Sequence, residues 1–440
     1  MRAFQLKVFF AVVYAALFLM ISASKGLAQQ NSQGNVQPVK TDLTVDSISI
    51  PRLVRAALEV NPELVAMRRE FDAAKARIPQ AKALPDPMVM FGNITVGNPI
   101  PFTGNEDDFH DYYIGVTQEF PWFGVRRLRG LVASSETEAK FQEYMATTRR
   151  LTAEVKMAAY DLYFVDRSLS VIKRDIDILK RFAQVAEARY SVGKAQQIDV
   201  INARLEIATL LDQQGTLEAK RASTAARINN LLFLDPLTPI GSFAEIEMSP
   251  EPPPLEELVR LALESAPELQ QQRRLIDSSS HALRLAEREA KYPEVGFNFT
   301  YHKRINFPDY YTYGITLKLP LYAFNKQRYA IEEQSANLAA GRSRLASTNS
   351  LIRYRLRDAY VRATTAARLI RLTEEGIVPQ ATLALESALA SYQVGEVDFL
   401  TLLNALKRAL DYETRYYELL TDYQKALAEM EPLIGLELTK

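Results

Sequence analysis

The chain has 440 residues, which is enough for two or three ordinary domains. Lysine plus arginine and aspartate plus glutamate number 53 each, so the zero net charge indicates neither a nucleic-acid-binding surface nor a solvating acidic tail. Cysteine is absent, which excludes disulfides and thiolate sites. The three histidines are far apart in the sequence, which argues against a histidine-based metal or acid–base centre.

Residues 1–28 have the features of a secretory signal peptide. Arg2 and Lys7 give a positive start, an apolar run follows over residues 8–21, and small residues end the segment. The alternative is a retained membrane anchor, for which the run is short because a spanning helix needs about 20 apolar residues. No cysteine follows the signal, so we do not expect lipidation on cysteine. Residues 29–50 are polar and predicted to be a flexible N-terminal segment.

An internal duplication governs the rest of the chain. The segment L-V-R-A-A-L-E-V-N-P-E-L from Leu53 is echoed by L-V-R-L-A-L-E-S-A-P-E-L from Leu258, and A-R-Y-S-V-G-K from Ala188 is echoed by A-S-Y-Q-V-G-E from Ala390. The two pairs are offset by about the same number of residues, so one unit is present twice in nearly constant register.

The domain organisation follows from this duplication. We assign the first repeat to residues 51–235 and the second repeat to residues 255–435, each with a helix, two strands and a long helical hairpin. Residues 236–254 between them are rich in proline and are predicted to be a linker, or equatorial region.

The helical hairpin of the first repeat is indicated by its length and its heptad pattern. Residues 131–192 contain neither glycine nor proline, Gly193 then makes a turn, and a second long helix is predicted over residues 196–234. Apolar residues recur with the alternating spacing of four and three that is typical of a coiled coil. This seam consists of Leu151, Val155, Ala158, Leu162, Val165, Leu169, Ile172, Ile176, Leu179, Ala183, Ala186 and Tyr190.

The second repeat is predicted to form the same hairpin with one irregularity. Heptad positions run from Leu345 to Ile370, and Gly376 and Pro379 should then kink the helix. Gly395 makes the turn, and a returning helix follows.

Each repeat also contains two segments with the alternating pattern of strands. They lie near residues 87–96 and 112–121 in the first repeat and near residues 294–301 and 311–320 in the second. Each is about nine residues long, which is enough for a tilted strand to cross a bilayer. One face is apolar and the other is small or polar, as lipid outside and water inside require.

Aromatic residues crowd the strand ends, as in the interfacial belts of membrane proteins. The candidate belt residues are Tyr112, Phe120, Trp122, Phe123, Tyr311, Tyr322 and Phe324. We assign Met88 and Met90 to the apolar strand face, as lipid contacts rather than soft-metal ligands. The alternative interpretation of the strands is two soluble hairpins with one buried face.

Membrane strands impose a requirement on the oligomer. The edge of a sheet cannot lie in lipid because its N–H and C=O groups would lack partners. Four strands cannot close on themselves, since the smallest membrane barrels have about eight. The sequence therefore predicts eight strands in a dimer or twelve in a trimer.

The order of these elements, with a Y-x-V-G turn at Tyr190 and again at Tyr392, resembles the TolC family of outer-membrane efflux channels. The segment Q-E-F-P-W-F-G-V-R-R (Gln118–Arg127) is similar to members that work with heavy-metal efflux pumps. The resemblance covers residues 50–435. It implies a mainly α fold with a β membrane part: a homotrimer with a 12-stranded outer-membrane β-barrel, continued by a long periplasmic α-helical barrel.

The same resemblance implies a function and partners. The chain would be a passive exit duct of the cell outer membrane, extending into the periplasm and gated at its periplasmic tip. Its partners would be a periplasmic adaptor (membrane fusion) protein, an inner-membrane pump of the RND type and outer-membrane lipid. No nucleic acid is expected.

The resemblance places Gly193 and Gly395 at the tip, together with pore candidates in the first repeat. Asp199 matches a position where relatives often have a carboxylate facing the pore axis, and Asn202 follows on the same face. The alternative role of Asp199 is to cap the helix after the turn. Tyr190 is either a gate contact or a residue that packs at the turn.

The second repeat carries the matching candidates with substitutions. Asn404 matches Asn202, and Asp398 lies one turn before the position that matches Asp199. Tyr392 matches the gate tyrosine of the family, but Val397 stands where an arginine is expected. A polar latch of the family type is therefore not predicted from these positions.

The chain contains no glycine-rich phosphate loop, nucleophile elbow or cluster of metal ligands, so we predict neither an enzyme nor a bound cofactor or metal. Two other functions remain open at this point. One is the outer-membrane component of type I protein secretion, and the other is a periplasmic coiled-coil scaffold that transports nothing.

Overall fold

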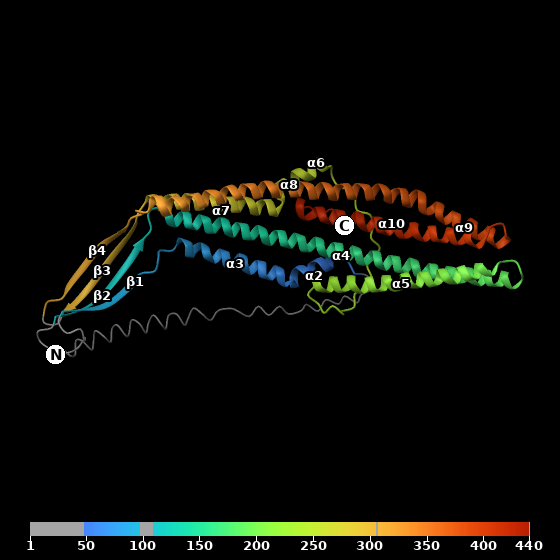
Figure 1. The fold of residues 1–440 in the computed structure, drawn as a ribbon, viewed down its shortest axis with the longest axis horizontal. Helices are drawn as coiled ribbons and strands as arrows, with labels where there is room; N and C mark the ends of the chain where they lie inside the picture. Colours follow the sequence, from blue (N-terminus) through green and yellow to red (C-terminus); the bar gives the residue numbers. More distant parts are fainter. Residues whose placement is uncertain (1–47, 97–108, 305–306, 440) are drawn as a thin grey trace. The chain divides into compact units, whose positions relative to one another are not determined.

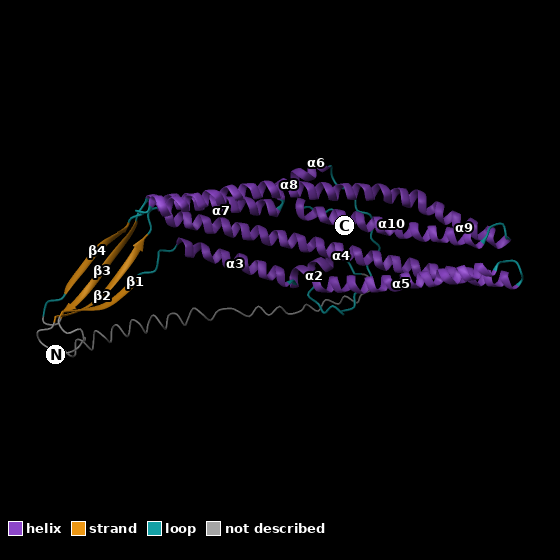
Figure 2. Ribbon diagram, in the orientation of Figure 1, coloured by secondary structure: helices purple, strands orange, loops and turns teal. Residues whose placement is uncertain are grey.

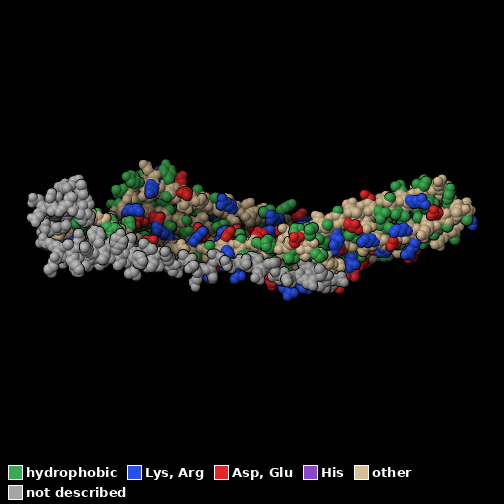
Figure 3. Space-filling model, turned by 90° about the horizontal axis from the view of Figure 1, so that it is seen from below, with side chains coloured by type: hydrophobic (Ala, Val, Ile, Leu, Met, Phe, Trp, Pro, Cys, Tyr) green, Lys and Arg blue, Asp and Glu red, His purple; other side chains and the backbone are tan. Residues whose placement is uncertain are grey.

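The computed structural model describes residues 48–96, 109–304 and 307–439, which belong to one compact unit (Figure 2). The predicted signal peptide and residues 29–47 lie outside the described residues. Within the described ranges, no helix combines the length and the apolarity that a membrane crossing demands. Charged side chains of both signs are interspersed along the helices on the face drawn in Figure 3.

The two halves of the chain contain the same order of elements (Figure 1). The first half consists of α2 (Ile50–Val60), α3 (Pro62–Lys82), β1 (Met88–Val96), β2 (Phe109–Phe120), α4 (Val125–Ser191) and α5 (Gln197–Leu231). The second half consists of α6 (Leu255–Ser265), α7 (Pro267–Lys291), β3 (Glu294–Arg304), β4 (Tyr310–Lys318), α8 (Arg328–Leu372), α9 (Val378–Val394) and α10 (Phe399–Ile434). Two π-helical segments, Ala323–Gln327 and Thr373–Ile377, flank α8.

Proline sets the start of α3 and α7 at equivalent points of the two repeats. Pro62 and Pro267 stand in the first turn, where a backbone N–H is not needed. Asn61 caps α3, because its side-chain oxygen accepts a hydrogen bond of 2.9 Å from the N–H of Glu63.

The four strands form one antiparallel sheet in the order β1-β2-β3-β4. They lie within three residues of the ranges predicted from the alternation, and β2 begins earlier than predicted, at Phe109. Strands β2 and β3 join the two repeats, with Gly115 opposite Thr300. Strands β1 and β4 are the edges, so each has one side without a partner strand in the sheet of the protomer.

The register corrects the predicted orientation of β1. Val89 lies opposite Val116, and Phe91 lies opposite Ile114, so these residues share the apolar face. Met90 lies opposite Gly115 and therefore belongs to the small and polar face, as does Met88. The pattern of β1 alone is ambiguous because both of its faces carry apolar residues.

The helices pack side by side in two sets (Figure 1). Next to the sheet, contacts run in the order α3, α4, α7, α8. Beyond them, contacts run in the order α5, α4, α10, α9. Helix α4 is 67 residues long and takes part in both sets, so it is the scaffold of the fold.

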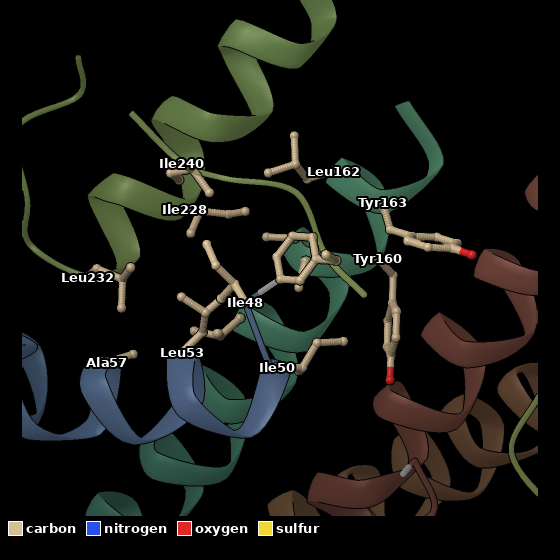
Figure 4. Packing of buried hydrophobic residues seen from close by; sticks show 14 of the residues in the cluster. Ile48, Ile50, Leu53, Ala57, Tyr160, Leu162, Tyr163, Ile228, Leu232 and Ile240 are labelled. Carbon is tan, nitrogen blue, oxygen red and sulfur yellow. The ribbon is translucent and has the colours of Figure 1, made fainter. Parts of the chain in front are cut away.

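A hydrophobic core forms where the two sets meet, around the middle of α4 (Figure 4). Leu53 of α2, Leu162 of α4 and Ile228 of α5 have no exposed surface there. Ile48 and Ile240 come from the segments that flank the repeats, and Figure 4 shows them pointing into the same cluster. The linker is therefore packed on the first hairpin.

The predicted heptad seam of α4 is buried from Leu151 to Ala186 except at Ala183, which is partly buried. Tyr190 does not continue the seam, because it is 46% exposed in the last turn of the helix. In the second repeat, the expected kink takes the form of the π-helical segment at residues 373–377, followed by Pro379 in the first turn of α9.

A buried ion pair fixes the end of the chain to α4. Lys156 Nζ lies 2.6 Å from Glu431 Oε2 and donates to Thr439 Oγ1 at 2.8 Å. The other carboxylate oxygen of Glu431 accepts hydrogen bonds from the N–H groups of Leu438 and Thr439. These extra donors satisfy the carboxylate, which offsets part of the cost of removing both charges from water.

Asp175 of α4 is a second buried carboxylate, and it has fewer hydrogen-bond donors than Glu431. It is 3% exposed, and Arg174 Nε donates to it at 3.2 Å, but the same guanidinium also binds Glu413. Burial raises the pKa of Asp175, with Glu413 acting in the same direction and Arg174 against them. Desolvation therefore outweighs the ion pair at this position.

We predict that Asp175→Asn stabilises the protein at neutral pH. Because the pKa is higher in the folded state than in the unfolded state, the folded state binds more protons and stability falls as pH rises through that interval. The variant removes this loss, so its denaturation midpoint should rise at pH 7.5. The gain should shrink towards pH 4. Asp177→Asn, at an exposed neighbour, is the control, and an equal gain in both variants would contradict the assignment.

Candidate functional site: the helical tip and the sheet

Two glycine turns form the tip of the hairpins, at the end away from the sheet (Figure 1). Gly193 follows α4 with φ +75°, and Gly395 follows α9 with φ +89°. Only glycine adopts this left-handed conformation without strain. A Cβ atom at residue 395 would also lie 3.1 Å from Arg189 Nη2, whereas the space around Gly193 is open.

The two matching tyrosines have different environments. Tyr392 is 2% exposed, and its ring meets the Phe399 ring edge-on at 5.6 Å. Tyr190 is 46% exposed and lies outside this core. The hydroxyl of Tyr392 is buried without a hydrogen-bond partner among the described residues.

Arg189 links the two hairpins. From the last turn of α4, its guanidinium lies 4.8 Å above the Tyr392 ring and donates to the carbonyl groups of Tyr392 and Gln393. It also donates to the Lys194 carbonyl at 3.5 Å. A single cation therefore binds the C-terminal end of α9 and the turn of its own hairpin, where carbonyl groups lack helical partners.

Sequence reasoning missed Arg189. The duplication aligns Arg189 with Ser391, so the arginine is present in one repeat only. The resemblance predicts an arginine at residue 397, five residues after Tyr392, but valine stands there. A search for basic residues near the turn of the other repeat would have found Arg189, but only the structure shows that the turns are adjacent.

The acidic residues of the tip have separate roles. Asp398 is the N-cap of α10, since its carboxylate accepts a hydrogen bond of 2.9 Å from Thr401 N–H. Hydrogen bonding to the Thr401 side chain, and then to its N–H group, lowers the pKa of Asp398. Asp199 lies in the first turn of α5, whose N-cap is Gln196, so it does not cap the helix by its side chain. Burial raises the pKa of Tyr392, and the nearby charge of Asp199 acts in the same direction.

The asparagines take different positions. Asn202 is partly buried on α5, while Asn404 is exposed on α10 and lines a cavity between α9 and α10. The structure brings Asp199 near Tyr392, but it does not bring the two asparagines into one cluster with them.

The sheet presents one apolar exposed face. Phe297, Phe299 and Ile315 are 44 to 71% exposed, and the register places them on the same side. A contiguous apolar patch that is exposed in this way marks a surface that contacts a protein, a ligand or a membrane. The face is therefore suited to contact with lipid.

Most of the predicted belt residues are exposed at the ends of this face. The exposed ones are Phe120, Phe123, Tyr311, Tyr322 and Phe324. Tyr112 was also expected in this belt, but the structure corrects that prediction because only 7% of the residue is exposed. Trp122 is also partly buried, because its ring stacks on Tyr292 at 5.3 Å in a contact between the repeats.

The opposite face of the sheet carries polar groups. Asp111 Oδ2 accepts a hydrogen bond of 2.9 Å from the Tyr310 hydroxyl and lies 2.9 Å from His302 Nδ1. His302 Nε2 lies 3.3 Å from the Thr312 hydroxyl. The described residues contain no group of three or more histidine, cysteine or acidic side chains that could hold a metal ion.

These features define a class of protein. A duplicated unit with paired long hairpins, and one sheet with an apolar exposed face, is the fold of the protomer of a channel of the outer membrane. Residues 53–232 and 258–436 match the family model of outer membrane efflux proteins, so the chain belongs to that family. The predicted efflux role at the outer membrane and the mainly α, duplicated fold are thereby confirmed.

Individual relatives agree with this family. The cobalt-zinc-cadmium resistance protein CzcC of Cupriavidus metallidurans is 22% identical over 442 aligned residues, which cover 98% of this chain and 99% of that protein. The structure of CusC aligns with a TM-score of 0.77 at 12% identity, over 92% of this chain and 98% of CusC. The CmeC outer membrane channel of Campylobacter jejuni gives 0.76 at 13% identity, over 94% of both chains.

We predict that Arg189→Ala loosens the turn of the second hairpin. The loss of a charge-assisted hydrogen bond costs about 1.5–3 kcal/mol, so hydrogen exchange of the backbone amides around Gly395 should speed up roughly ten- to hundredfold. Arg204→Ala, which removes an exposed ion pair with Glu187, should leave these amides unchanged. Unaltered exchange in Arg189→Ala would show that the link does not restrain the turn.

Proposed function

We propose that three copies of the chain form a passive exit duct, with a 12-stranded barrel in the outer membrane and a helical barrel in the periplasm. The observation that carries this proposal is the sheet, which combines an apolar exposed face with two edges that lack partners in the protomer. In lipid, each unpaired backbone group costs several kcal/mol, so β4 of one copy must pair with β1 of the next.

The polar face of the sheet favours three copies over two. Eight strands leave an interior that side chains fill, whereas larger barrels leave an aqueous channel. The face with Gly115, Thr300 and Asp111 is small and polar, as a water-filled lumen requires. Export by a signal peptide and an outer-membrane location agree with this arrangement.

The tip is the proposed gate, and the second hairpin is its moving part. Helix α4 is continuous, but the matching helix of the second repeat is interrupted by the π-helical segment at residues 373–377. π-bulges are frequent at functional sites and mark positions where a helix bends. Arg189 and Tyr392 would hold the gate closed from the rigid hairpin, and Asp199 would face the pore.

Energy would come from partners, since the protomer contains no nucleotide-binding or catalytic motif among its described residues. We propose an inner-membrane pump of the RND type, which reaches the duct through a periplasmic adaptor. The name of the relative CzcC supports cobalt, zinc or cadmium ions as the cargo.

Purified protein in planar bilayers tests the duct and the role of Asp199 together. The wild-type protein should conduct, and divalent cations should block the current, because three carboxylates near one axis attract them. Asp199→Asn should weaken the block about tenfold. Glu218→Gln, on the same helix but about 28 Å away along the axis, should not change it. An absence of conductance would contradict the duct, and an unchanged block would remove Asp199 from the pore.

Metal tolerance tests the cargo. Disruption of the gene should sensitise its host to cobalt, zinc or cadmium, and expression of the intact chain should restore growth. Tolerance of an organic dye serves as the control and should not change. Normal metal tolerance in the disrupted strain would contradict heavy-metal cargo without affecting the duct.

A further inference from the structure

Helices α4 and α7 pack side by side and meet the two central strands of the sheet (Figure 1). Four residues separate β2 from the start of α4, and two separate the end of α7 from β3. The polar layer on each side of the hydrocarbon core of a bilayer is roughly 5–8 Å deep, and one helical turn is about 5.4 Å long. If the apolar face of the sheet contacts lipid, the sheet-side turns of both helices therefore lie at the level of the lipid headgroups.

One ion-pair group shows which side of these helices continues the polar face of the sheet. Arg129 Nη2 lies 2.8 Å from Glu289 Oε1 and 3.9 Å from Glu294 Oε1. The even-numbered residues of β3 form the polar face, so Glu294 belongs to it, and Arg129 and Glu289 point to that side. Residues two positions apart point about 200° away from each other around a helix. Arg127 of α4 and Lys291 of α7 therefore lie on the other side, with the apolar face.

Three cationic side chains meet on this second side, in the groove between α4 and α7. Arg127 and Lys291 are exposed, and Arg288 is partly buried between them. A Cβ atom at Gly124 would lie 3.1 Å from Arg288 Cζ, so the guanidinium packs against the start of α4. Arg288 Cζ and Lys291 Nζ each lie 5.5 Å from the centre of the Tyr292 ring. The charges of α7 are therefore held close to the first turn of α4.

Within the described ranges, no acidic side chain forms an ion pair with any of these three cations. Arg288 Nε is buried and has no hydrogen-bond partner among the described residues, which is costly for a charged donor. The first turn of α4 has neither an acidic residue nor a side-chain cap, although a helix N-terminus favours negative charge. Glu287 shares the face of Lys291, but it lies one turn further from the sheet. The groove is thus suited to an anion.

The surroundings of the groove favour a lipid headgroup as this anion. Phe123, which precedes α4, is 83% exposed, and the apolar face continues on β3 with Phe297, which is 49% exposed. A phospholipid brings its phosphate to the cations and its acyl chains to these apolar side chains at the same time. Arginine binds phosphate through paired N–H groups, and basic pockets between helices at a membrane surface bind acidic headgroups. The amine of a zwitterionic headgroup would be repelled by three cations.

We propose that the groove between α4 and α7 binds the phosphate of one anionic phospholipid per protomer, from the leaflet that faces the periplasm. Arg288 donates to the phosphate from the floor of the groove, and Arg127 and Lys291 contact it from the two sides. The inference rests on the proposed insertion of the sheet in the outer membrane and adds a specific lipid to it. Because α4 and α7 belong to different repeats, the lipid joins the two repeats at the base of the sheet.

Native mass spectrometry of the protein in detergent tests the site, with phosphatidylglycerol as the anionic probe and phosphatidylcholine as the zwitterionic one. The wild-type protein should retain one phosphatidylglycerol per protomer, about tenfold more tightly than phosphatidylcholine. Arg127→Gln with Lys291→Gln should weaken this binding roughly twentyfold, because each cation near a membrane surface contributes about fivefold. Arg126→Gln with Lys326→Gln is the matched control. It removes two exposed cations near the same level but outside the groove, and it should change binding less than about twofold.

Three results would overturn the site. Equal retention of the two lipids, or an equal loss in the control variant, would leave only a general attraction between cations and membranes. Displacement of phosphatidylglycerol by inorganic phosphate would assign the groove to a soluble anion instead. Conductance of the same preparation separates the two proposals: trimers that conduct but show no lipid preference would contradict the lipid site alone, whereas monomers that do not conduct would contradict the proposed function.

Discussion

The whole architecture depends on the hydrogen-bonding requirement of strand edges in lipid. Four strands expose two rows of backbone groups, and no water is available in a bilayer to satisfy them. The requirement acts at the sheet, and the helices next to the sheet keep the order of the repeats, with α3 and α4 of the first repeat beside α7 and α8 of the second. Association in the membrane is therefore specified by backbone chemistry.

The duplication gives two similar hairpins, and the differences between them suggest a division of labour. The first hairpin has an uninterrupted helix and supplies Arg189. The second has the π-helical segment and the buried Tyr392, which receives that arginine. Because Arg189 aligns with Ser391, the link cannot form in the reverse direction. We propose that the first hairpin is a fixed support and that the Arg189 contact, which restrains the tip of the second hairpin, is released when the duct opens.

Much of the fold could be predicted from the sequence because repeats, glycine turns and periodicity are local signals. The strands of the second repeat alternate cleanly, but β1 has apolar residues on both faces, and only its register with β2 placed Met88 and Met90. Tyr190 fitted the heptad count, yet it is exposed because the helix ends there. The pairing of Arg189 with Tyr392 depends on two turns that lie far apart in sequence, so no local pattern contains it.

The central claim is that the sheet of one copy is completed by other copies. The most direct test is the native mass of the mature protein extracted from outer membranes, compared with 49.7 kDa for the full-length chain. The account predicts a particle of three protomers that dissociates on heating in detergent. A monodisperse, water-soluble monomer with the apolar face of its sheet protected from solvent would contradict it.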